Sequence, residues 1–412
     1  MKVASFCSYL RGGAGGSSLK LHNALLSKGI DSYLYCIDAP DDIIKGNKNI
    51  FALGAGCIRD DLVTRLPLRN DNGFNIISSG YGNQYHQELN DIYQSSDIIL
   101  LRWVTDFISD YQISSWTSKA KPIIWCLSDM APFTGGCHYS NGCNKYISDC
   151  SECNIASYNY NSHPKLTLTR RQSIWHMLTV VAPSQWIADC AAKSKIFSDF
   201  PVKIIQTGVE LDIFHPLNDC ENKAIDVIKK DSNKKYILFG ADYQDDPRKG
   251  GKFLKSVFKK LEALRNKQQD IVIVFLGGLN HDIEFLTNCE IINVNYIADK
   301  RKLAEIYNAV DLTVLPYIED NLPNIMLESI ACGTPVVSFD VGGMPDVIVN
   351  NVNGKIVPLG DCHEMALAIN EILNKPIGTD IVSGYARDHL DIDIQARKYI
   401  DLFDTLCKTE AK

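Results

Sequence analysis

The chain has 412 residues, a formal net charge of -7 at pH 7 and 45% hydrophobic residues. Such a length exceeds the roughly 250 to 300 residues at which a single core stops growing, so we expect two domains. The composition is that of a globular protein and excludes a disordered or fibrous chain. The negative charge argues against general nucleic-acid binding, which relies on a basic surface.

The start of the chain does not resemble an export signal, because Arg11 and a run of glycines follow only a few apolar residues. No apolar stretch reaches the roughly 18 residues that a membrane-spanning helix needs. Ten of the 14 cysteines are scattered singly along the chain, several in expected core segments. This distribution is typical of reduced thiols, so we expect a cytoplasmic protein.

The first half alternates between short apolar strands and segments long enough to hold helices. Residues 3–7 form the first expected strand, a glycine-rich loop runs from Gly12 to Gly16, and apolar residues at helical spacing follow from Leu19. Further strands are expected at 33–37, 97–101, 122–127 and 179–182. This alternation predicts an open parallel sheet.

A polar stretch rich in Asn, Asp and Lys, residues 218–235, interrupts the pattern before it starts again. Strands are then expected at 236–240, 271–276, 312–316 and 335–339, and an amphipathic helix at 394–407. We therefore predict an α/β protein with two Rossmann-like domains. The expected parts are an N-terminal domain at 1–206, a C-terminal domain at 207–385, and a helical segment at 386–412 that packs back on the first domain.

Three glycines of the first loop, Gly13, Gly15 and Gly16, are candidate phosphate-binding residues. Between a strand and a helix, their amides and the helix dipole can face an anion with no Cβ atoms in the way. A plain glycine turn is the alternative. A dinucleotide-binding fingerprint would place glycine where Ser18 stands, so an NAD-dependent oxidoreductase, with Asp38 on the ribose, fits less well.

Two carboxylates stand eight positions apart in the second half, Asp320 and Glu328, where an expected strand leads into a helix. If Asn321 caps that helix and Pro323 lies in its first turn, the amides that follow, at Asn324 and Ile325, point into the cleft between the domains. A diphosphate can dock on such a helix end while a carboxylate accepts hydrogen bonds from a ribose. A solvated acid pair at a helix start is the alternative.

Arg248 and Lys249 follow the first strand of the second half, where a doubly wound sheet holds its ligand. Two cations at this position can neutralise a leaving diphosphate in place of a metal ion. The alternative is a solvated surface pair.

Four cysteines gather within one polar segment beside His138: Cys137, Cys143, Cys150 and Cys153. Four thiols ending in Cys-X-X-Cys are candidate ligands of one structural zinc ion. Their outer spacings are not those of a common zinc module, so a packed thiol cluster and disulfide pairs remain the alternatives.

Together these motifs resemble family 4 glycosyltransferases of the GT-B fold, most closely bacterial members that build capsule, O-antigen or colanic acid sugars. The resemblance runs over essentially the whole chain and rests on residues 12–16, 129–139, 182–184, 208–210, 248–250, 320–328 and 342–346. It implies two Rossmann-like domains facing each other across a cleft. It also implies transfer of a sugar, with retention, from a UDP- or GDP-sugar to an acceptor hydroxyl without a catalytic metal. A glycan or lipid-linked acceptor is implied, and peripheral contact with the inner face of the membrane fits such an acceptor.

The resemblance assigns roles to several of these residues. Lys249, helped by Arg248, meets the donor diphosphate, Glu328 the ribose and Asp320 the hydroxyls of the transferred sugar, while the first glycine loop lies near phosphate and acceptor. The family usually has Glu where this chain has Asp320, and often His where it has Ser128. The acceptor side, which we assign to Ser128, Asp129 and His138, therefore departs from the family pattern. His138 is the candidate substitute, and a structural histidine beside an aromatic residue is the alternative.

Three other functions fit some of these motifs. A nucleotide-sugar epimerase or an inverting transferase would share the fold, but the segment from Asp320 to Glu328 favours retaining family 4. A non-catalytic sugar-nucleotide-binding subunit is a further alternative, because Ser128 and Asp320 depart from the usual residues.

Overall fold

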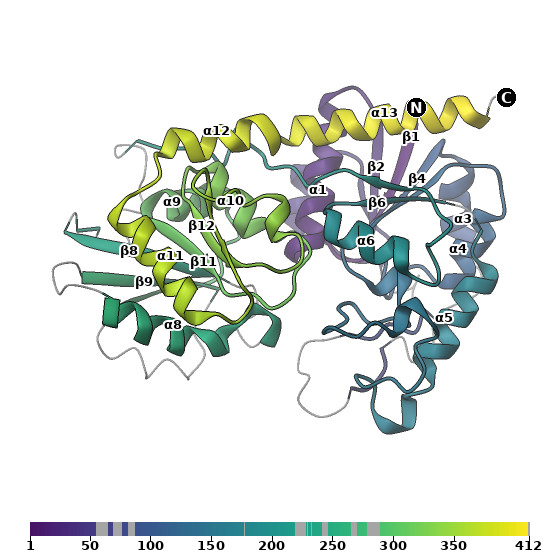
Figure 1. Ribbon diagram of the computed structural model, residues 1–412. Coiled ribbons are helices and arrows are strands. Elements are labelled where there is room, and N and C mark those ends of the chain that lie inside the picture. Colours follow the sequence, from purple (N-terminus) through teal and green to yellow (C-terminus); the bar gives the residue numbers. More distant parts are fainter. Residues whose placement is uncertain are drawn as a thin grey trace. The chain divides into compact units, whose positions relative to one another are not determined.

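The computed structural model describes residues 1–54, 65–68, 76–80, 87–176, 178–218, 228, 230–231, 233–240, 246–264, 270–277 and 289–410. The chain divides into two compact units, unit 1 (Met1–Thr207 with Ile392–Lys412) and unit 2 (Gly208–Asp391) (Figure 1). Each unit holds one sheet whose strand pairs are all parallel, with helices packed against it. These sheets confirm the predicted α/β fold with two Rossmann-like domains.

The sheet of unit 1 has seven strands in the order β3-β2-β1-β4-β5-β6-β7. In chain order they are β1 (Lys2–Phe6), β2 (Asp31–Cys36), β3 (Ile50–Ala52), β4 (Ile98–Leu101), β5 (Ile123–Cys126), β6 (Thr179–Ala182) and β7 (Val202–Ile204). The four central strands β1, β4, β5 and β6 are buried almost throughout, as expected for a parallel sheet covered on both faces.

The helices of unit 1 form a layer on each face of this sheet. On one face, α1 and α13 bury Leu21, Leu25, Tyr399 and Phe403 against the strands. On the other face, α3 to α6 contribute a second core that includes Trp116. The helices are α1 (Gly12–Ser27), α2 (Asp41–Gly46), α3 (Gln87–Gln94), α4 (Asp110–Thr117), α5 (His163–Ile174), α6 (Gln185–Lys193) and α13 (Ile392–Glu410), with short 3-10 helices η2 (Ala131–Phe133), η3 (Lys145–Ile147) and η4 (Tyr158–Tyr160).

The glycine run at the start of α1 corrects one prediction. We expected a loop from Gly12 to Gly16 before the helix, but α1 begins at Gly12, so these glycines form its first turn. A Cβ atom at Gly15 would lie 2.5 Å from the backbone oxygen of Tyr9. Close packing of the helix against the chain that leaves β1 therefore requires glycine at this position, whatever ligand the turn binds.

The sheet of unit 2 has six strands in the order β10-β9-β8-β11-β12-β13. They are β8 (Lys234–Gly240), β9 (Asp270–Leu276), β10 (Glu290–Val294), β11 (Leu312–Leu315), β12 (Val336–Phe339) and β13 (Gly354–Val357). The helices are α8 (Gly251–Leu264), α9 (Lys300–Ala309), α10 (Asn324–Ala331), α11 (Cys362–Asn374) and α12 (Thr379–His389), with 3-10 helices η5 (Pro247–Lys249) and η7 (Met344–Asp346). The strand order reverses between β8 and β11, and doubly wound sheets bind ligands at such a point.

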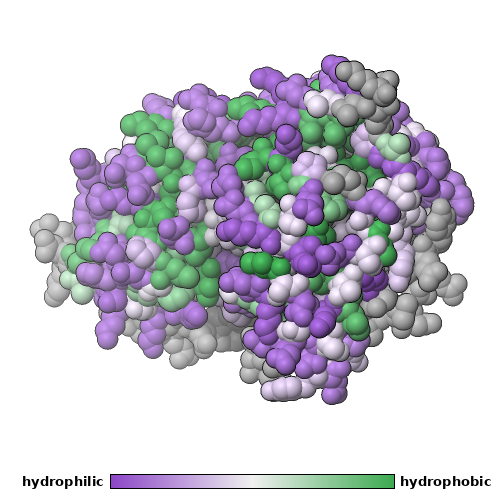
Figure 2. Space-filling model, turned by 45° about the vertical axis from the view of Figure 1, so that its right-hand side comes forward, coloured by the Kyte–Doolittle hydropathy of each residue, from purple (hydrophilic) through white to green (hydrophobic). Residues whose placement is uncertain are grey.

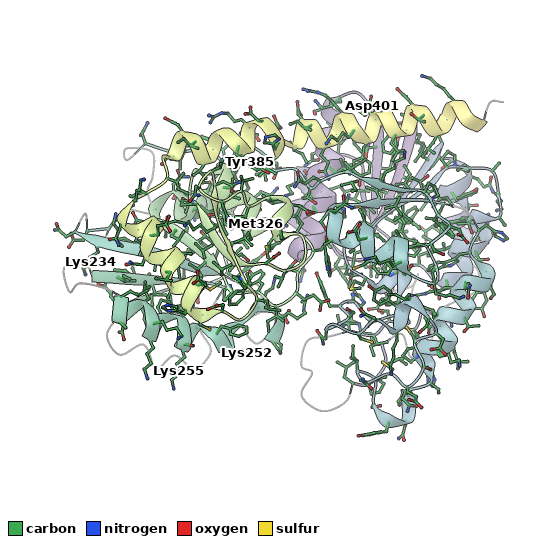
Figure 3. All side chains as sticks on the ribbon, viewed as in Figure 1. Lys234, Lys252, Lys255, Met326, Tyr385 and Asp401 are labelled. Atoms are coloured by element: carbon green, nitrogen blue, oxygen red, sulfur yellow. The ribbon has the colours of Figure 1, made fainter. Side chains whose placement is uncertain are left out.

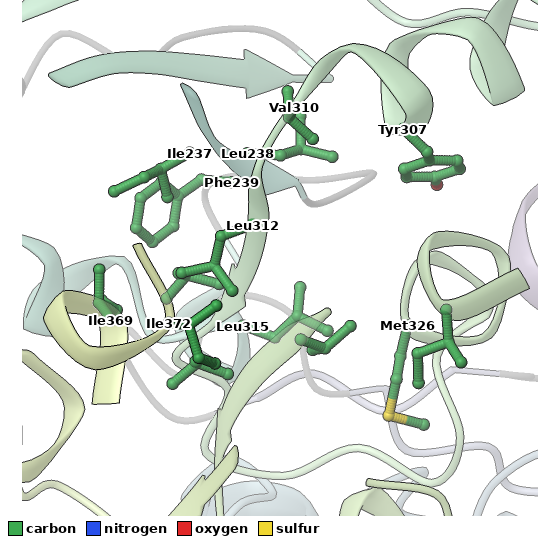
Figure 4. Close-up of a cluster of buried hydrophobic side chains, with 14 of the residues drawn as sticks. Ile237, Leu238, Phe239, Tyr307, Val310, Leu312, Leu315, Met326, Ile369 and Ile372 are labelled. Atoms are coloured by element: carbon green, nitrogen blue, oxygen red, sulfur yellow. The ribbon is translucent and has the colours of Figure 1, made fainter. Parts of the chain in front are cut away.

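The core of unit 2 lies between this sheet and two groups of helices. Helix α8 packs on α11, while α10 packs on α9 and α12, and Figure 1 shows the two groups on opposite sides of the strands. Figure 4 shows Phe239, Leu312 and Ile369 close together within this core, and all three are buried. The strands that carry the functional loops are thus held by a continuous apolar core.

The surface in view is of mixed polarity, because hydrophilic residues are interspersed with hydrophobic ones (Figure 2). Exposed large hydrophobic side chains are spread along the chain, for example Tyr158, Tyr296 and Ile381. Figure 3 shows Lys252 and Lys255 extending from α8 away from the sheet. Among the described residues, no helix is both long and apolar enough to span a bilayer.

Candidate functional site

The carboxyl ends of β8 and β11 bring together the two predicted charged segments of unit 2. Strand β8 leads toward η5, which holds Arg248 and Lys249, and β11 leads to the segment that ends in Asp320. The two strands are neighbours in the sheet, so residues that follow them meet at the same edge. The backbone N–H of Ile318 donates to the backbone oxygen of Arg248 at 2.6 Å, which ties the two segments together.

Lys249 and Asp320 form an ion pair at this edge, with Nζ 2.7 Å from Oδ2. Their side chains are 18% and 11% exposed, so water screens the pair only partly. The Lys249 ammonium also lies 4.1 Å from the centre of the Tyr317 ring, and the Tyr317 hydroxyl donates to the backbone oxygen of Gly240 at 2.6 Å. A cation is therefore held in a fixed position beside the sheet edge.

Arg248 is held by a partner that the sequence reasoning missed. Its Nε donates to Oδ1 of the buried Asp246 at 3.1 Å, and Nη2 contacts the other carboxylate oxygen. The same carboxylate caps η5 by accepting from the Arg248 backbone N–H at 3.0 Å. Asp246 thus balances the charge of Arg248, whereas Lys249 reaches Asp320. The signal for this pairing was an acid two positions before the arginine.

Two glycines make room for the segment that carries Asp320. Gly250 has φ 71°, and a Cβ atom there would lie 1.6 Å from the backbone oxygen of Pro316. Gly342 has φ 54°, and a Cβ atom there would lie 1.7 Å from the backbone oxygen of Asp320. Neither position accommodates another residue without a shift of the backbone, so both glycines help to fix the place of Asp320.

Helix α10 begins at Asn324, and Pro323 takes the N-cap position, which corrects the expectation that Asn321 caps the helix. Proline suits this place because a helix leaves its first N–H groups without an internal partner. The side chain of Ile325 packs over the end of β8, since a Cβ atom at Gly240 would lie 2.2 Å from its Cδ1. The first turn of α10 is thereby anchored beside the carboxyl end of β8.

Glu328 lies about one turn further along α10 and is half-buried. Its Oε2 accepts a hydrogen bond from the Tyr307 hydroxyl of α9 at 3.0 Å. Burial, together with the charge of Glu328, raises the pKa of Tyr307 well above its usual value, so the phenol stays protonated and donates to the carboxylate. The sequence reasoning missed Tyr307, whose hydroxyl orients the Glu328 carboxylate.

The carboxyl edge of the sheet in unit 1 carries a second set of polar residues. Asp129 follows β5, and its Oδ2 lies 2.6 Å from Nδ1 of His138 and 2.7 Å from Nε1 of Trp103, which follows β4. The other ring nitrogen of His138 lies 2.8 Å from the Ser78 hydroxyl. In the tautomer that carries its proton on Nδ1, His138 donates to Asp129 and its Nε2 accepts from Ser78.

This network joins two of the three residues predicted for the acceptor side, and Ser128 precedes Asp129 in the chain. Asp129, His138 and Ser78 are all buried. The Trp103 ring is half-buried, and its centre lies 6.2 Å from that of Tyr9 and 5.5 Å from that of His138. The sequence reasoning missed Ser78 and Trp103; the position of Trp103 two residues after a strand was the available signal.

The four clustered cysteines line one small cavity in unit 1, and all four are free thiols. Burial raises the pKa of Cys150 to about 12, and burial likewise raises that of Cys137 well above its usual value. Both thiols are therefore neutral unless a cation stabilises the thiolate. Within the described ranges, no three Cys, His, Asp or Glu side chains converge as in a formed metal site.

Comparison with known proteins connects the second unit to a family. Residues 234–375 match the family model of group 1 glycosyl transferases. The Escherichia coli K12 protein named as a colanic acid biosynthesis glycosyl transferase, WcaC, is 24% identical over 295 residues, which are 69% of this chain and 68% of that protein. A D-inositol 3-phosphate glycosyltransferase from Mycobacteroides abscessus is 27% identical over 182 residues, which are 42% of this chain and 39% of that protein.

A solved structure resembles the chain over almost its full length. The Anabaena protein Alr3699/HepE, in complex with UDP and glucose, has a TM-score of 0.67 at 14% identity, with 98% of this chain and 100% of that chain covered. This likeness confirms the GT-B fold. The match to residues 234–375 contains Lys249, Asp320 and Glu328, which the structure places around the carboxyl edge of one sheet.

Proposed function

Because residues 234–375 match the family model of group 1 glycosyl transferases, we propose that this chain is a retaining glycosyltransferase that uses a nucleotide-sugar donor and adds a sugar to a bacterial surface glycan. The donor we propose is a UDP-sugar, with a GDP-sugar as the alternative. The observation that carries the proposal is the Lys249–Asp320 ion pair beside the start of α10, at the reversal point of the sheet. A cation, amides and carboxylates there match the parts of a nucleotide sugar.

The donor diphosphate meets Lys249 and the first turn of α10 in this proposal. The amides of Asn324 and Ile325 and the dipole of the helix favour an anion, and Lys249 adds a full positive charge. Arg248 helps indirectly, because its pair with Asp246 orders η5, which carries Lys249. As the sugar–oxygen bond breaks, negative charge grows on the leaving diphosphate, so the same groups stabilise the transition state and no metal ion is needed.

The two carboxylates have separate tasks. Glu328, oriented by Tyr307, accepts hydrogen bonds from the ribose hydroxyls, which change little during the reaction. Asp320 accepts from hydroxyls of the transferred sugar, whose ring gains positive charge in the transition state. When donor binds, the diphosphate competes for Lys249 and leaves Asp320 available to the sugar. The acceptor oxygen bonds to the anomeric carbon on the face from which diphosphate leaves, and its proton passes to the leaving phosphate oxygen.

The acceptor binds on unit 1 in this proposal, along the carboxyl edge that carries Ser128, Asp129 and His138. The Ser78–His138–Asp129 chain fixes the Trp103 indole through its bond to Asp129. Gly13, Gly15 and Gly16, in the first turn of α1, lie at the same edge and favour phosphate. A glycan or lipid-linked sugar with a phosphate fits such a surface, and we place the reaction in the cytoplasm, at the inner face of the membrane.

The test is a thermal-shift screen with UDP, GDP and ADP, followed by the sugars of the nucleotide that binds. A ligand at 100 times its Kd should stabilise the protein by about 2.7 kcal/mol. We expect UDP to give the largest shift, and Lys249→Ala to reduce it while the fold remains intact. Failure of all three nucleotides would refute the proposal. Binding without donor hydrolysis or transfer would instead favour a non-catalytic sugar-nucleotide-binding subunit.

A further inference from the structure

The thiol-lined cavity of unit 1 takes no part in the proposed transfer. Cys137, Cys143, Cys150 and Cys153 surround it, together with apolar neighbours such as Ile155 and the buried ring of Tyr146. The space between these side chains is small, about 20 Å³, which is the room that one water molecule or ion occupies. We propose that these four cysteines bind one structural zinc ion as thiolates.

A residue with positive φ lies at or directly before each of these cysteines, and for a residue other than glycine this conformation costs free energy. Gly136, with φ 107°, precedes Cys137, and Gly142, with φ 76°, precedes Cys143. In the Cys-X-X-Cys segment, Cys150 itself has φ 53° and Glu152 has φ 47°. Two non-glycine residues in this conformation within three positions form a tight turn that places both thiols beside the same cavity.

Two backbone groups at the cavity favour thiolates. The Ala156 backbone N–H donates to Sγ of Cys153 at 3.4 Å, and the Gly135 backbone hydrogen-bonds to Cys150. Lys145 also lines the cavity, and its Nζ is held by the backbone oxygen of Glu152 at 2.8 Å. Four thiolates and one zinc ion together carry a charge of -2, which N–H groups that donate to the thiolates partly offset. Hydrogen bonds of this kind to ligand atoms orient and tune metal sites.

The chain around the cavity has little regular structure to hold it. Between β5 and α5 it forms only the 3-10 helices η2, η3 and η4 within the described residues, yet Phe133, Tyr146 and Ile155 are buried. A tetrahedral zinc centre links such a segment and contributes its binding free energy to folding. Since the four thiols line the cavity without a formed metal arrangement, binding requires their side chains to rotate inward.

The consequence for the protein concerns the acceptor side. Cys137 directly precedes His138, whose backbone N–H donates to the oxygen of Ile76 at 3.0 Å and whose ring holds Asp129. A zinc ion on Cys137 therefore fixes the start of the Ser78–His138–Asp129 chain. With four protein ligands the ion has no open position, so it shapes this edge and performs no chemistry.

The test is the metal content of protein purified without a metal-affinity step. We expect about one zinc ion per chain and its loss in the double variant Cys150→Ser/Cys153→Ser, because thiolates are the preferred ligands of a structural site. The matched control is Cys190→Ser, a half-buried cysteine on α6 that does not line the cavity, which should keep the zinc.

A second measurement, on the wild-type protein, tests the proposal even if the double variant fails to fold. Zinc is removed from the wild-type protein under reducing conditions, and cobalt is added, because tetrahedral cobalt bound to thiolates absorbs visible light. The proposal is wrong if the isolated protein contains no zinc and its reduced form shows no cobalt–thiolate absorption. In that case, fewer than four titratable thiols in the segment would identify disulfides. Zinc retained by the double variant overturns it as well. None of these readouts depends on transferase activity.

Discussion

Replacing Asp320 by asparagine tests the division of work between the two carboxylates. The substitution keeps the size of the side chain and one acceptor oxygen, but it removes the charge that Lys249 meets at 2.7 Å. Asp320 is 8% exposed as a residue, so the change occurs in a largely desolvated place. Its backbone contacts with Gly342 and Gly343 stay intact, because they involve only the main-chain oxygen.

The expected loss of stability is modest. Breaking a fully buried pair by removing one partner costs about 3–5 kcal/mol, whereas an exposed pair contributes about 0–1 kcal/mol. Lys249 is 18% exposed, stays over the Tyr317 ring and can still donate to the amide oxygen. We therefore expect a loss of about 1–2 kcal/mol, which corresponds to a fall of roughly 2–8 °C in Tm for a domain of this size.

The expected loss of activity is larger. An oriented group that meets developing charge typically contributes 2.7–4 kcal/mol to the transition state, so kcat should fall by about 10²- to 10³-fold. Free UDP contains no sugar at the position of transfer, so its Kd should change little. The measurements are steady-state kinetics with the donor found by the thermal-shift screen, calorimetry with free UDP and a denaturant titration.

The matched variant is Glu328→Gln, whose amide oxygen can still accept from Tyr307 at the 3.0 Å position of the carboxylate. Loss of charge-assisted hydrogen bonds to the ribose costs about 1.5–3 kcal/mol, so the donor KM and the Kd of UDP should rise about 10- to 100-fold with little effect on kcat. If Asp320→Asn abolished UDP binding while Glu328→Gln left it intact, the assignment would be wrong. Asp320→Glu should cause a smaller loss or a changed donor preference, because it restores the charge with a longer reach.

Three further predictions follow from individual contacts. Lys249→Ala should weaken UDP binding and lower kcat together, and Lys249→Arg should show a smaller effect. Magnesium should neither restore the activity of the variant nor stimulate the wild-type protein. Wild-type activity that is lost to a chelator and regained with magnesium would contradict this prediction. Gly250→Ala should destabilise the fold by at least about 1–3 kcal/mol in a urea titration, because its Cβ would lie 1.6 Å from the Pro316 oxygen, whereas Gly251→Ala has open space and should not. His138→Ala should raise the acceptor KM and leave the Kd of UDP unchanged; a weakened UDP affinity would place this residue on the donor instead.

Much of the fold was predictable from local pattern alone. The strand expected at 179–182 is β6 with the same bounds, and the main strands of both sheets were found because they are apolar runs buried on both faces. Strands β3, β7, β10 and β13 escaped prediction because they are short or only partly buried, so their sequences carry no such run. Their conformation depends on pairing with a neighbouring strand, which is a tertiary contact.

Local sequence also predicted which residue types to expect at the candidate sites, because a glycine run, a cation pair and two spaced acids each suit part of a nucleotide sugar. Tertiary structure decided their partners. Tyr307 reaches Glu328 from another helix, and Ser78 reaches His138 across 60 positions of the chain. Likewise, Lys249 and Asp320 are 71 positions apart and meet because β8 and β11 are neighbours in the sheet. Sequence spacing specifies periodicity along one element, whereas pairing between distant elements depends on how the sheet orders its strands.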